Sequence, residues 1–132
     1  MTIHEMQNLN RATIEYASTV IVPGMMLAQL RKLCEEYMLS HGADSFWYWD
    51  VGAFVFAGDK TAVSVSGREY KTDDHIIELN DIITIDLSPQ NNCIWGDYAR
   101  TLIVENGRIV PVCFCKDRVL VVLRQSFFQQ RL

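Results

Sequence analysis

The order of the predicted elements places this chain in the α+β class, with two helices packed on one face of a mainly antiparallel sheet. Three observations predict this class. Apolar residues recur at helical spacing only near the start of the chain, over 3–20 and 25–41. Runs rich in β-branched and aromatic residues then follow one another from residue 46 onward, and turn-forming residues separate them. Helices that precede the strands, rather than alternate with them, are typical of an α+β fold.

The two predicted helices are separated by a clear break. Pro23-Gly24 interrupts the periodic pattern, and the second helix ends at His41-Gly42, where glycine suits the C-terminal cap. Their shared feature is an apolar inner face. It comprises Met6, Leu9, Thr13, Tyr16, Ala17 and Val20 in the first helix, and Met26, Leu27, Leu30, Leu33, Cys34, Tyr37 and Met38 in the second.

Strands are predicted over 46–56, 62–66, 81–88 and 94–104. Asn106-Gly107 is a strong tight-turn signal, so the chain is expected to return as a further strand over 108–112. The tail, residues 112–132, is strand-like up to residue 123 and then reads either as a short helix or as a frayed end.

Length and composition indicate one domain, residues 1–132, that can bury a core. A net charge of -4 argues against a nucleic-acid partner, which favours a basic face. No apolar run approaches the roughly 20 residues that span a bilayer. The N-terminus lacks the features of a signal peptide, and the four cysteines show no disulfide or zinc spacing, so a reducing, cytoplasmic location is expected.

Asp86 and Asp97 are the most informative pair in the chain. Asp86 is the one charged residue in the apolar run 82–87, and Asp97 lies in the next predicted strand. A hairpin centred on Asn91-Asn92 places the two carboxylates opposite each other, with Cβ atoms roughly 5 Å apart. Such a pair needs a cation between the carboxylates, or one carboxylate must hold a proton. The alternative is an acidic pair at a solvated hairpin edge.

The hairpin resembles the metal-binding strands of the pita-bread metallopeptidases, the family of methionine aminopeptidases and Xaa-Pro peptidases. The matching residues are Asn80-Asp81-Ile-Ile-Thr-Ile-Asp86 and Gly96-Asp97-Tyr-Ala-Arg100-Thr101. The helix pair joined at Pro23-Gly24-Met25 also resembles the first half of that family. The resemblance covers roughly residues 5 to 110 and implies half of a pita-bread (creatinase/aminopeptidase) fold.

By this resemblance, Asp86 and Asp97 are expected to be carboxylate ligands of a divalent metal pair, of Mn, Co, Fe or Zn, that activates a bridging water. Arg100 is expected either as a partner for a ligand carboxylate or as a surface cation. Thr101 has the same strand parity as Asp97, and is expected either to share its face or to be simply a good strand former. No other catalytic residue is assigned.

Two departures from the family pattern affect the expected function. The family's second half supplies a His and two Glu ligands, but after Asp97 this chain has no His, and Glu105 is its only Glu. The chain is therefore expected to be a truncated N-terminal half. The family also carries a substrate-side His before the first Asp, whereas residues 64–70 contain none, and His75 lies too close to Asp86 to fit the pattern.

The leading functional hypothesis is a metal-dependent aminopeptidase or Xaa-Pro peptidase that acts on a peptide substrate when intact and is inactive as this chain alone. The alternative is a non-catalytic binding or assembly module that kept the fold. Half of a two-half fold leaves apolar surface uncovered, so a homo-oligomer is also expected. One form of that assembly has two copies each contributing a carboxylate pair. Nucleic acid and membrane are not expected partners.

Overall fold

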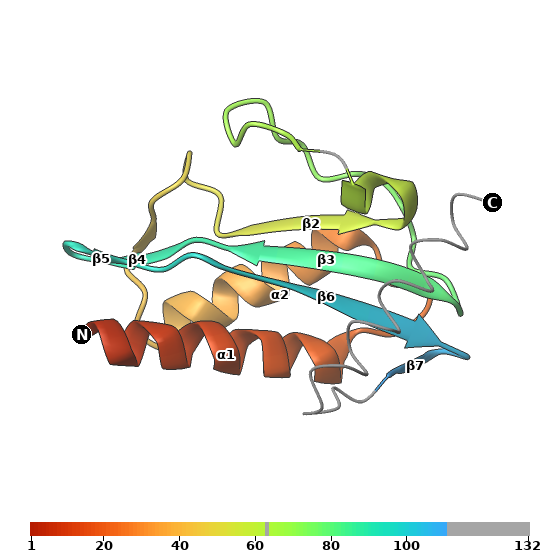
Figure 1. Cartoon of the computed structure of the whole chain (residues 1–132), viewed down its shortest axis with the longest axis horizontal. Helices are drawn as coiled ribbons and strands as arrows, with labels where there is room; N and C mark the ends of the chain where they lie inside the picture. The colour runs from red at the N-terminus through yellow and green to blue at the C-terminus, as the bar shows by residue number, and fades with distance from the viewer. Residues whose placement is uncertain (63, 111–132) are drawn as a thin grey trace.

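A computed structural model describes residues 1–62 and 64–110 and confirms the predicted α+β class (Figure 1). Helices α1 (Ile3–Val20) and α2 (Leu27–Ser40) precede all the strands of the described residues. A 3₁₀ helix, η1 (Gly58–Ala62), lies between two of the strands. The strands are β1 (Ser45–Phe46), β2 (Ala53–Ala57), β3 (Asp81–Leu87), β4 (Pro89–Asn91), β5 (Ile94–Trp95), β6 (Tyr98–Glu105) and β7 (Arg108–Ile109).

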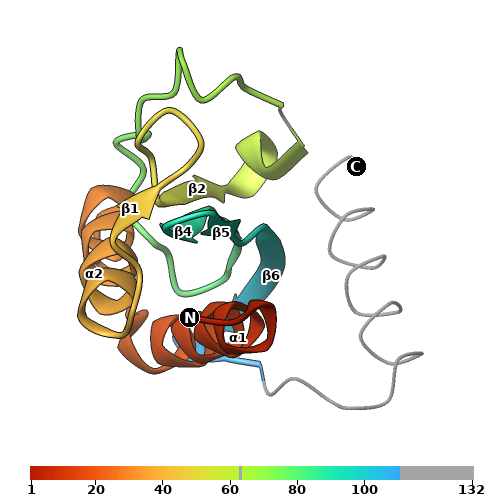
Figure 2. The same ribbon diagram turned by 90° about the vertical axis from the view of Figure 1, so that its left-hand side faces the viewer.

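The strands form two antiparallel sheets that share one long hairpin. Strands β2, β3, β6 and β7 form the main sheet in that order, and β1, β4 and β5 form a smaller sheet. The small sheet continues from the end of β3 and β6, and both helices lie against one face of the main sheet (Figures 1 and 2). The predicted packing of two helices on an antiparallel sheet is therefore confirmed.

The core lies between the helices and the inner face of the main sheet. Alternate residues of β3, namely Ile83, Ile85 and Leu87, are fully buried on that face, as the strand period of two requires. Full burial of each such side chain stabilises the fold by about 1.5–3 kcal/mol relative to exposure. The helices contribute Met6, Leu9, Ile14, Ala17, Leu27, Leu30, Cys34 and Met38 to the same core. Burial, and then the charge of Glu35, raises the pKa of the Cys34 thiol to about 12, so it packs as a neutral apolar group.

Helix α1 has the predicted bounds because Thr2 caps it. The Thr2 hydroxyl accepts a hydrogen bond from the Glu5 amide (3.1 Å), and the Glu5 carboxylate accepts one from the Thr2 amide (2.7 Å). Helix α2 begins two residues later than predicted, at Leu27. Met26 is extended (φ -81°, ψ 145°) and forms a β-bridge with Ile76, so it cannot start the helix.

The predicted single strand over 46–56 is wrong. Strand β1 ends at Phe46, and the chain turns before β2 begins at Ala53. Trp49 (φ 53°) and Asp50 (φ 57°) take the left-handed conformation, which ends any extended pairing, and the Val51 amide donates to the Tyr48 carbonyl to close the turn (3.1 Å). The aromatic run therefore forms a loop, because its rings pack on one another instead of alternating across a sheet.

The predicted strand over 62–66 is also wrong. Residues 58–62 form η1, and residues 64–66 have no regular structure. The Thr61 hydroxyl donates to the Gly58 carbonyl (2.8 Å), a local bond that competes with strand pairing. Farther along this segment, the Gly67 backbone lies against the rings of Tyr48, Trp49 and Phe54. The segment thus covers an aromatic cluster instead of joining the sheet.

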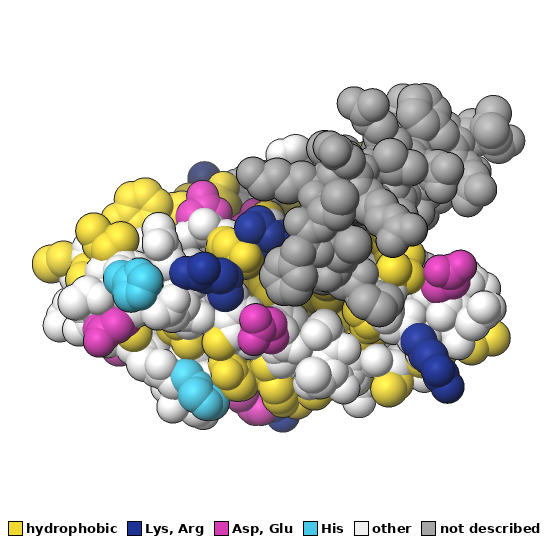
Figure 3. All heavy atoms as spheres, turned by 60° about the horizontal axis from the view of Figure 1, so that its bottom comes forward, with side chains coloured by type: hydrophobic (Ala, Val, Ile, Leu, Met, Phe, Trp, Pro, Cys, Tyr) yellow, Lys and Arg dark blue, Asp and Glu magenta, His cyan; other side chains and the backbone are white. Residues whose placement is uncertain are grey.

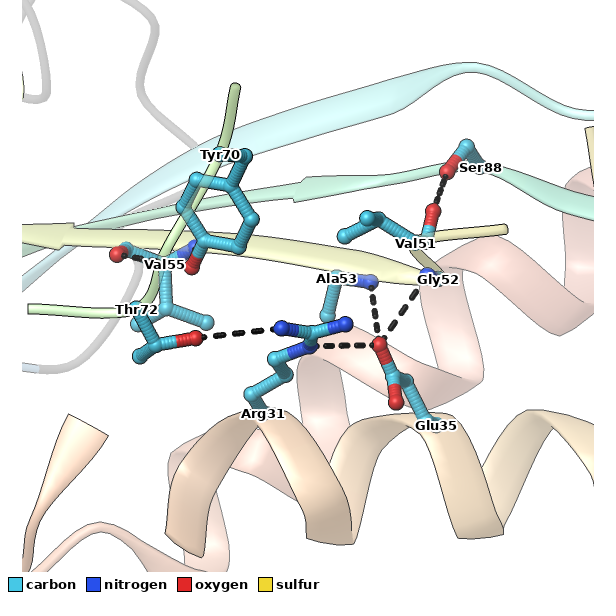
Figure 4. Close-up of polar contacts among 9 residues, drawn as sticks. All are labelled: Arg31, Glu35, Val51, Gly52, Ala53, Val55, Tyr70, Thr72 and Ser88. Carbon is cyan, nitrogen blue, oxygen red and sulfur yellow. Dashed lines mark hydrogen bonds and ion pairs between the residues drawn. The ribbon is translucent and has the colours of Figure 1, made fainter. Parts of the chain in front are cut away.

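The outer edge of β2 is covered by side chains (Figure 4). One Glu35 oxygen from α2 accepts hydrogen bonds from the amides of Gly52 (3.0 Å) and Ala53 (3.4 Å). The Tyr70 hydroxyl accepts one from the Val55 amide (3.0 Å). Arg31 holds Glu35 in place through its Nε (2.8 Å). These contacts occupy the groups that an edge strand otherwise leaves free for another strand.

At the end of the described residues, the structure agrees in part with the elements predicted from the sequence. Asn106 (φ 51°) and Gly107 (φ 78°) form the predicted tight turn, and β7 pairs back on β6. Of the predicted return strand over 108–112, β7 forms Arg108–Ile109, residue 110 lies outside it, and residues 111–112 are not among the described residues. The expectations for the tail, residues 112–132, lie outside the described residues.

The described surface gives two observations on possible partners. Lys and Arg side chains are interspersed with Asp and Glu on the part of the α1 face that is described (Figure 3). No helix among residues 1–62 and 64–110 is both long enough and apolar enough to cross a membrane.

Candidate metal centre

Asp86 is an acidic side chain near the C-terminal end of β3, an inner strand of the main sheet. It lies on β3 between Ile85 and Leu87, whose side chains enter the core, so Asp86 projects from the opposite face. Its direct partners are Phe54 of β2 and Ala99 of β6. The carboxylate is half-buried on a face that the helices do not cover.

The predicted direct opposition of Asp86 and Asp97 is wrong by two residues. Asn91 pairs with Ile94, so the hairpin is centred on Asn92-Cys93. Asn92 takes the left-handed conformation (φ 52°), which asparagine tolerates, and its amide donates to an Asp44 carboxylate oxygen (3.0 Å). Asp86 therefore pairs with Ala99.

Asp97 is a diagonal neighbour of Asp86, on the same face of the hairpin. Diagonal neighbours in an antiparallel pair are roughly 7–8 Å apart at the backbone, still within reach of side chains. Asp97 lies outside both β5 and β6, and its side chain is exposed. The part of the prediction that places both carboxylates on one face agrees with this register.

The two carboxylates interact directly. The pKa of Asp86 is raised from 3.8 to about 6, first by burial, then by the negative charge of Asp97 and by a hydrogen bond between the two side chains. This response is expected for a half-buried carboxylate beside a second carboxylate, because burial and the neighbouring charge both disfavour its ionised form. The pair is therefore an electrostatic unit, rather than two independent surface groups.

Thr101 and Arg100, the two residues predicted to lie beside Asp86 and Asp97, are on opposite faces of the sheet. Thr101 lies on the same face as Asp86, opposite Thr84, and their hydroxyls are 3.4 Å apart. Arg100 lies opposite the buried Ile85, so it starts from the other face of the sheet. Its guanidinium stacks on the Tyr98 ring, 4.0 Å from the centroid, and donates to the Ala99 carbonyl (2.7 Å).

His75 and Glu105, the other residues that the sequence analysis considered for a site, lie away from Asp86 and Asp97. The His75 ring makes a hydrogen bond to Asp81 (Nε2 to Oδ2, 2.6 Å) at the start of β3, roughly 17 Å along the strand from Asp86. Glu105 is an exposed residue at the β6–β7 turn, opposite Arg108. In residues 1–62 and 64–110, no three His, Cys, Asp or Glu side chains lie together in a way that could hold a metal ion.

The donor set fits part of a divalent metal site. Carboxylate oxygens suit hard and borderline divalent cations, and a cation would offset both the burial of the Asp86 charge and its repulsion by Asp97, the two main causes of the raised pKa of Asp86. Two carboxylates are fewer than the four to six ligands that such ions usually collect from protein and water. The described residues thus offer two carboxylates, fewer donors than a complete site of this kind needs.

Two residues at this site were missed by the sequence analysis. The Trp47 indole N–H donates to the Gly96 carbonyl (2.5 Å), and the buried Asn10 side chain of α1 lies against Gly96. Neither position carries a sequence signal of its own, since Trp47 belongs to an aromatic run and Asn10 sits in a helix. The only signal was Gly96 itself, in the Gly-Asp pair of the motif.

Comparison with known proteins assigns this sequence to a family. Residues 2–115 match the metallopeptidase family M24. The chain belongs to family M24. The predicted resemblance to the pita-bread metallopeptidases is thereby confirmed. Among curated proteins, no sequence matches this M24 chain.

Solved structures show the same fold. An X-Pro aminopeptidase from Thermotoga maritima MSB8 superposes with a TM-score of 0.69 at 20% identity, over 92% of this chain and 31% of that one. A prolidase from Pyrococcus horikoshii OT3 gives 0.67 at 20% identity, over 80% and 28%. An Xaa-Pro dipeptidase from Bacillus anthracis gives 0.66 at 22% identity, over 91% and 31%.

These likenesses confirm the pita-bread fold class. This M24 chain spans less than a third of the length of each of the three structures. At such identities the superpositions establish the fold alone.

Proposed function

We propose that Asp86 and Asp97 are two carboxylate ligands of a divalent metal site in a peptide-bond hydrolase. One observation carries the proposal: the two carboxylates share one face of the sheet, and burial followed by the charge of Asp97 raises the pKa of Asp86 to about 6. In a chain of a metallopeptidase family, an acidic pair that a cation would relieve is best explained as a place for that cation.

The chain's own residues would hold and orient the ions. Asp86 is fixed by the β3 ladder on both sides, so its half-buried carboxylate gives a rigid ligand. Asp97 is exposed beside it and gives the second ligand. When bound, a divalent metal pair supplies Lewis acidity and lowers the pKa of a coordinated water. Mn, Co, Fe and Zn all suit this donor set.

The proposed substrates are peptides cleaved at an N-terminal residue or at an Xaa-Pro bond. Support comes from the solved relatives, which are described as an X-Pro aminopeptidase, a prolidase and an Xaa-Pro dipeptidase. The remaining ligands would come from groups outside the described residues, either in the same polypeptide or in a second copy. We therefore propose that the 132-residue chain alone is catalytically silent and binds metal weakly. No observation favours the alternative of a non-catalytic binding module.

Titration of the 132-residue chain with Mn²⁺, followed by paramagnetic broadening of backbone amide signals, tests this proposal. Broadening should begin at Ala99, which lies opposite Asp86, and at Thr101 on the same face, with a dissociation constant weaker than micromolar. Asp86→Asn and Asp97→Asn should each reduce the affinity, since each removes one of two ligands. Asp59→Asn makes the same charge change on the exposed helix η1 and is the control.

Three results would contradict the proposal. The first is broadening that is unaffected by both site variants, or reduced equally by the control. The second is micromolar or tighter stoichiometric binding. The third is Xaa-Pro peptidase turnover by the chain alone that is lost in Asp97→Asn. The last two would show that the ligand set is already complete within this chain.

A further inference from the structure

We propose that Trp47 and Asn10 are positioning residues for Asp97, which act by fixing the Gly96 peptide from which Asp97 projects. This inference rests on the function proposed above, because it concerns the orientation of one proposed metal ligand. The need for such a device follows from the topology. Asp97 lies outside both β5 and β6, so the ladder hydrogen bonds that orient Asp86 do not orient Asp97.

Trp47 fixes the peptide unit that joins Gly96 to Asp97. Its indole N–H donates to the Gly96 carbonyl oxygen over 2.5 Å, across 49 residues of sequence. Because a peptide unit is planar, holding this oxygen also sets the direction of the Asp97 amide. On the other side, the Gly96 amide donates to the Pro89 carbonyl (2.8 Å). Gly96 is therefore held through both of its backbone polar groups.

Asn10 holds Gly96 from the direction of α1. A Cβ atom added to Gly96 would lie 2.6 Å from Asn10 Nδ2 and 3.1 Å from Met6 Cγ, so only glycine fits against the helix here. Asn10 is 2% exposed, and its side-chain oxygen is buried without a hydrogen-bond partner among residues 1–62 and 64–110. An unsatisfied buried acceptor lowers stability, and such groups often mark a functional constraint. The constraint inferred here is close packing on the Gly96 backbone.

The first test measures local opening in the metal-free 132-residue chain by amide hydrogen exchange. Trp47→Phe keeps an aromatic ring and removes the indole donor, so exchange of the Gly96 amide should accelerate roughly five- to tenfold. Exchange of Ile83 and Ile85 in β3 should stay unchanged, since the effect is local. Trp95→Phe is the matched control, because Trp95 is exposed and its ring lies 4.6 Å from that of Trp47.

The second test uses the Mn²⁺ titration as a double-mutant cycle. Trp47→Phe should weaken Mn²⁺ binding several-fold in the wild-type chain and should have no further effect in Asp97→Asn, because it acts through that carboxylate. Gly96→Ala should also weaken binding, and Asn10→Ala should restore part of the loss by vacating the space that the new methyl group needs.

The proposal is overturned if exchange at Gly96 is unchanged in Trp47→Phe, or if Trp47→Phe weakens Mn²⁺ binding equally with and without Asp97. If the wild-type chain and Asp97→Asn bind Mn²⁺ equally, the proposed metal function fails instead. In that case exchange at Gly96 alone decides whether Trp47 fixes this peptide.

Discussion

At the scale of single residues, ionisation of Asp86 lowers the stability of the folded chain. Its pKa is raised from 3.8 to about 6 by burial and by Asp97, so between these values the folded state binds more protons than the unfolded state. Stability therefore falls as the pH rises through this window. This loss of stability is absent below pH 3.8 and reaches its full value above about pH 6. Because Asp86 is only half-buried, water partly screens its charge. Its ionisation therefore lowers the free energy of unfolding by only about 1–2 kcal/mol.

We accordingly predict that Asp86→Asn stabilises the metal-free chain by about 1–2 kcal/mol at pH 8 and has little effect at pH 4. Urea denaturation with a chelator present, at both pH values, measures this difference. Asp59→Asn should change neither value. Equal effects of Asp86→Asn at the two pH values would show that the loss of stability does not arise from ionisation.

At the scale of elements, the outer edge of β2 is hydrogen-bonded by two side chains from outside the sheet, Glu35 and Tyr70. Tyr70 is buried, and its hydroxyl accepts the hydrogen bond of the Val55 amide. Tyr70→Phe keeps the ring in the cluster with Phe54 and Phe56 but leaves that amide without its acceptor. We predict a loss of about 1–3 kcal/mol in the free energy of unfolding.

Thermal denaturation of Tyr70→Phe, beside Tyr48→Phe, checks this prediction. Tyr48 belongs to the same aromatic cluster and is only partly buried, so removal of its hydroxyl should change stability by less than about 0.5 kcal/mol. Similar losses in the two variants would indicate that the hydroxyl of Tyr70 has no special role at the β2 edge.

Elements with strong local signals were predictable, and those shaped by distant contacts were not. The capping box fixed the start of α1, and Asn106-Gly107 fixed the last turn. In contrast, nothing near Trp49 in the sequence predicts its left-handed conformation, and in the structure its ring lies against Gly67, 18 residues farther along the chain. The face of the two aspartates followed from strand parity, whereas their register depended on which asparagine formed the turn.

At the scale of the whole molecule, exposed apolar side chains gather near the turn between the helices. Val22 (53% exposed), Met26 (44%), Ile76 (55%) and Leu79 (62%) belong to this region, where Met26 bridges to Ile76. We predict that the chain forms a dimer or larger assembly, because exposed patches of this kind usually mark an interface.

Light scattering at micromolar concentration measures the mass of the assembly. The double variant Ile76→Glu/Leu79→Glu should shift it toward the monomer if this region is the interface. Ile3→Glu is a suitable control, since Ile3 is 70% exposed and lies at the start of α1. A wild-type chain that is monomeric under these conditions would refute the prediction.

The covered edge of β2 has a consequence for solubility. Polymers built by strand addition need two free edges on each subunit, so that every arriving molecule leaves a new site for the next. Glu35 and Tyr70 occupy the backbone groups on one edge of the main sheet, which blocks growth in that direction. Any pairing through the opposite edge would therefore end after two molecules. The side chains that anchor β2 thus also oppose open-ended growth through the main sheet.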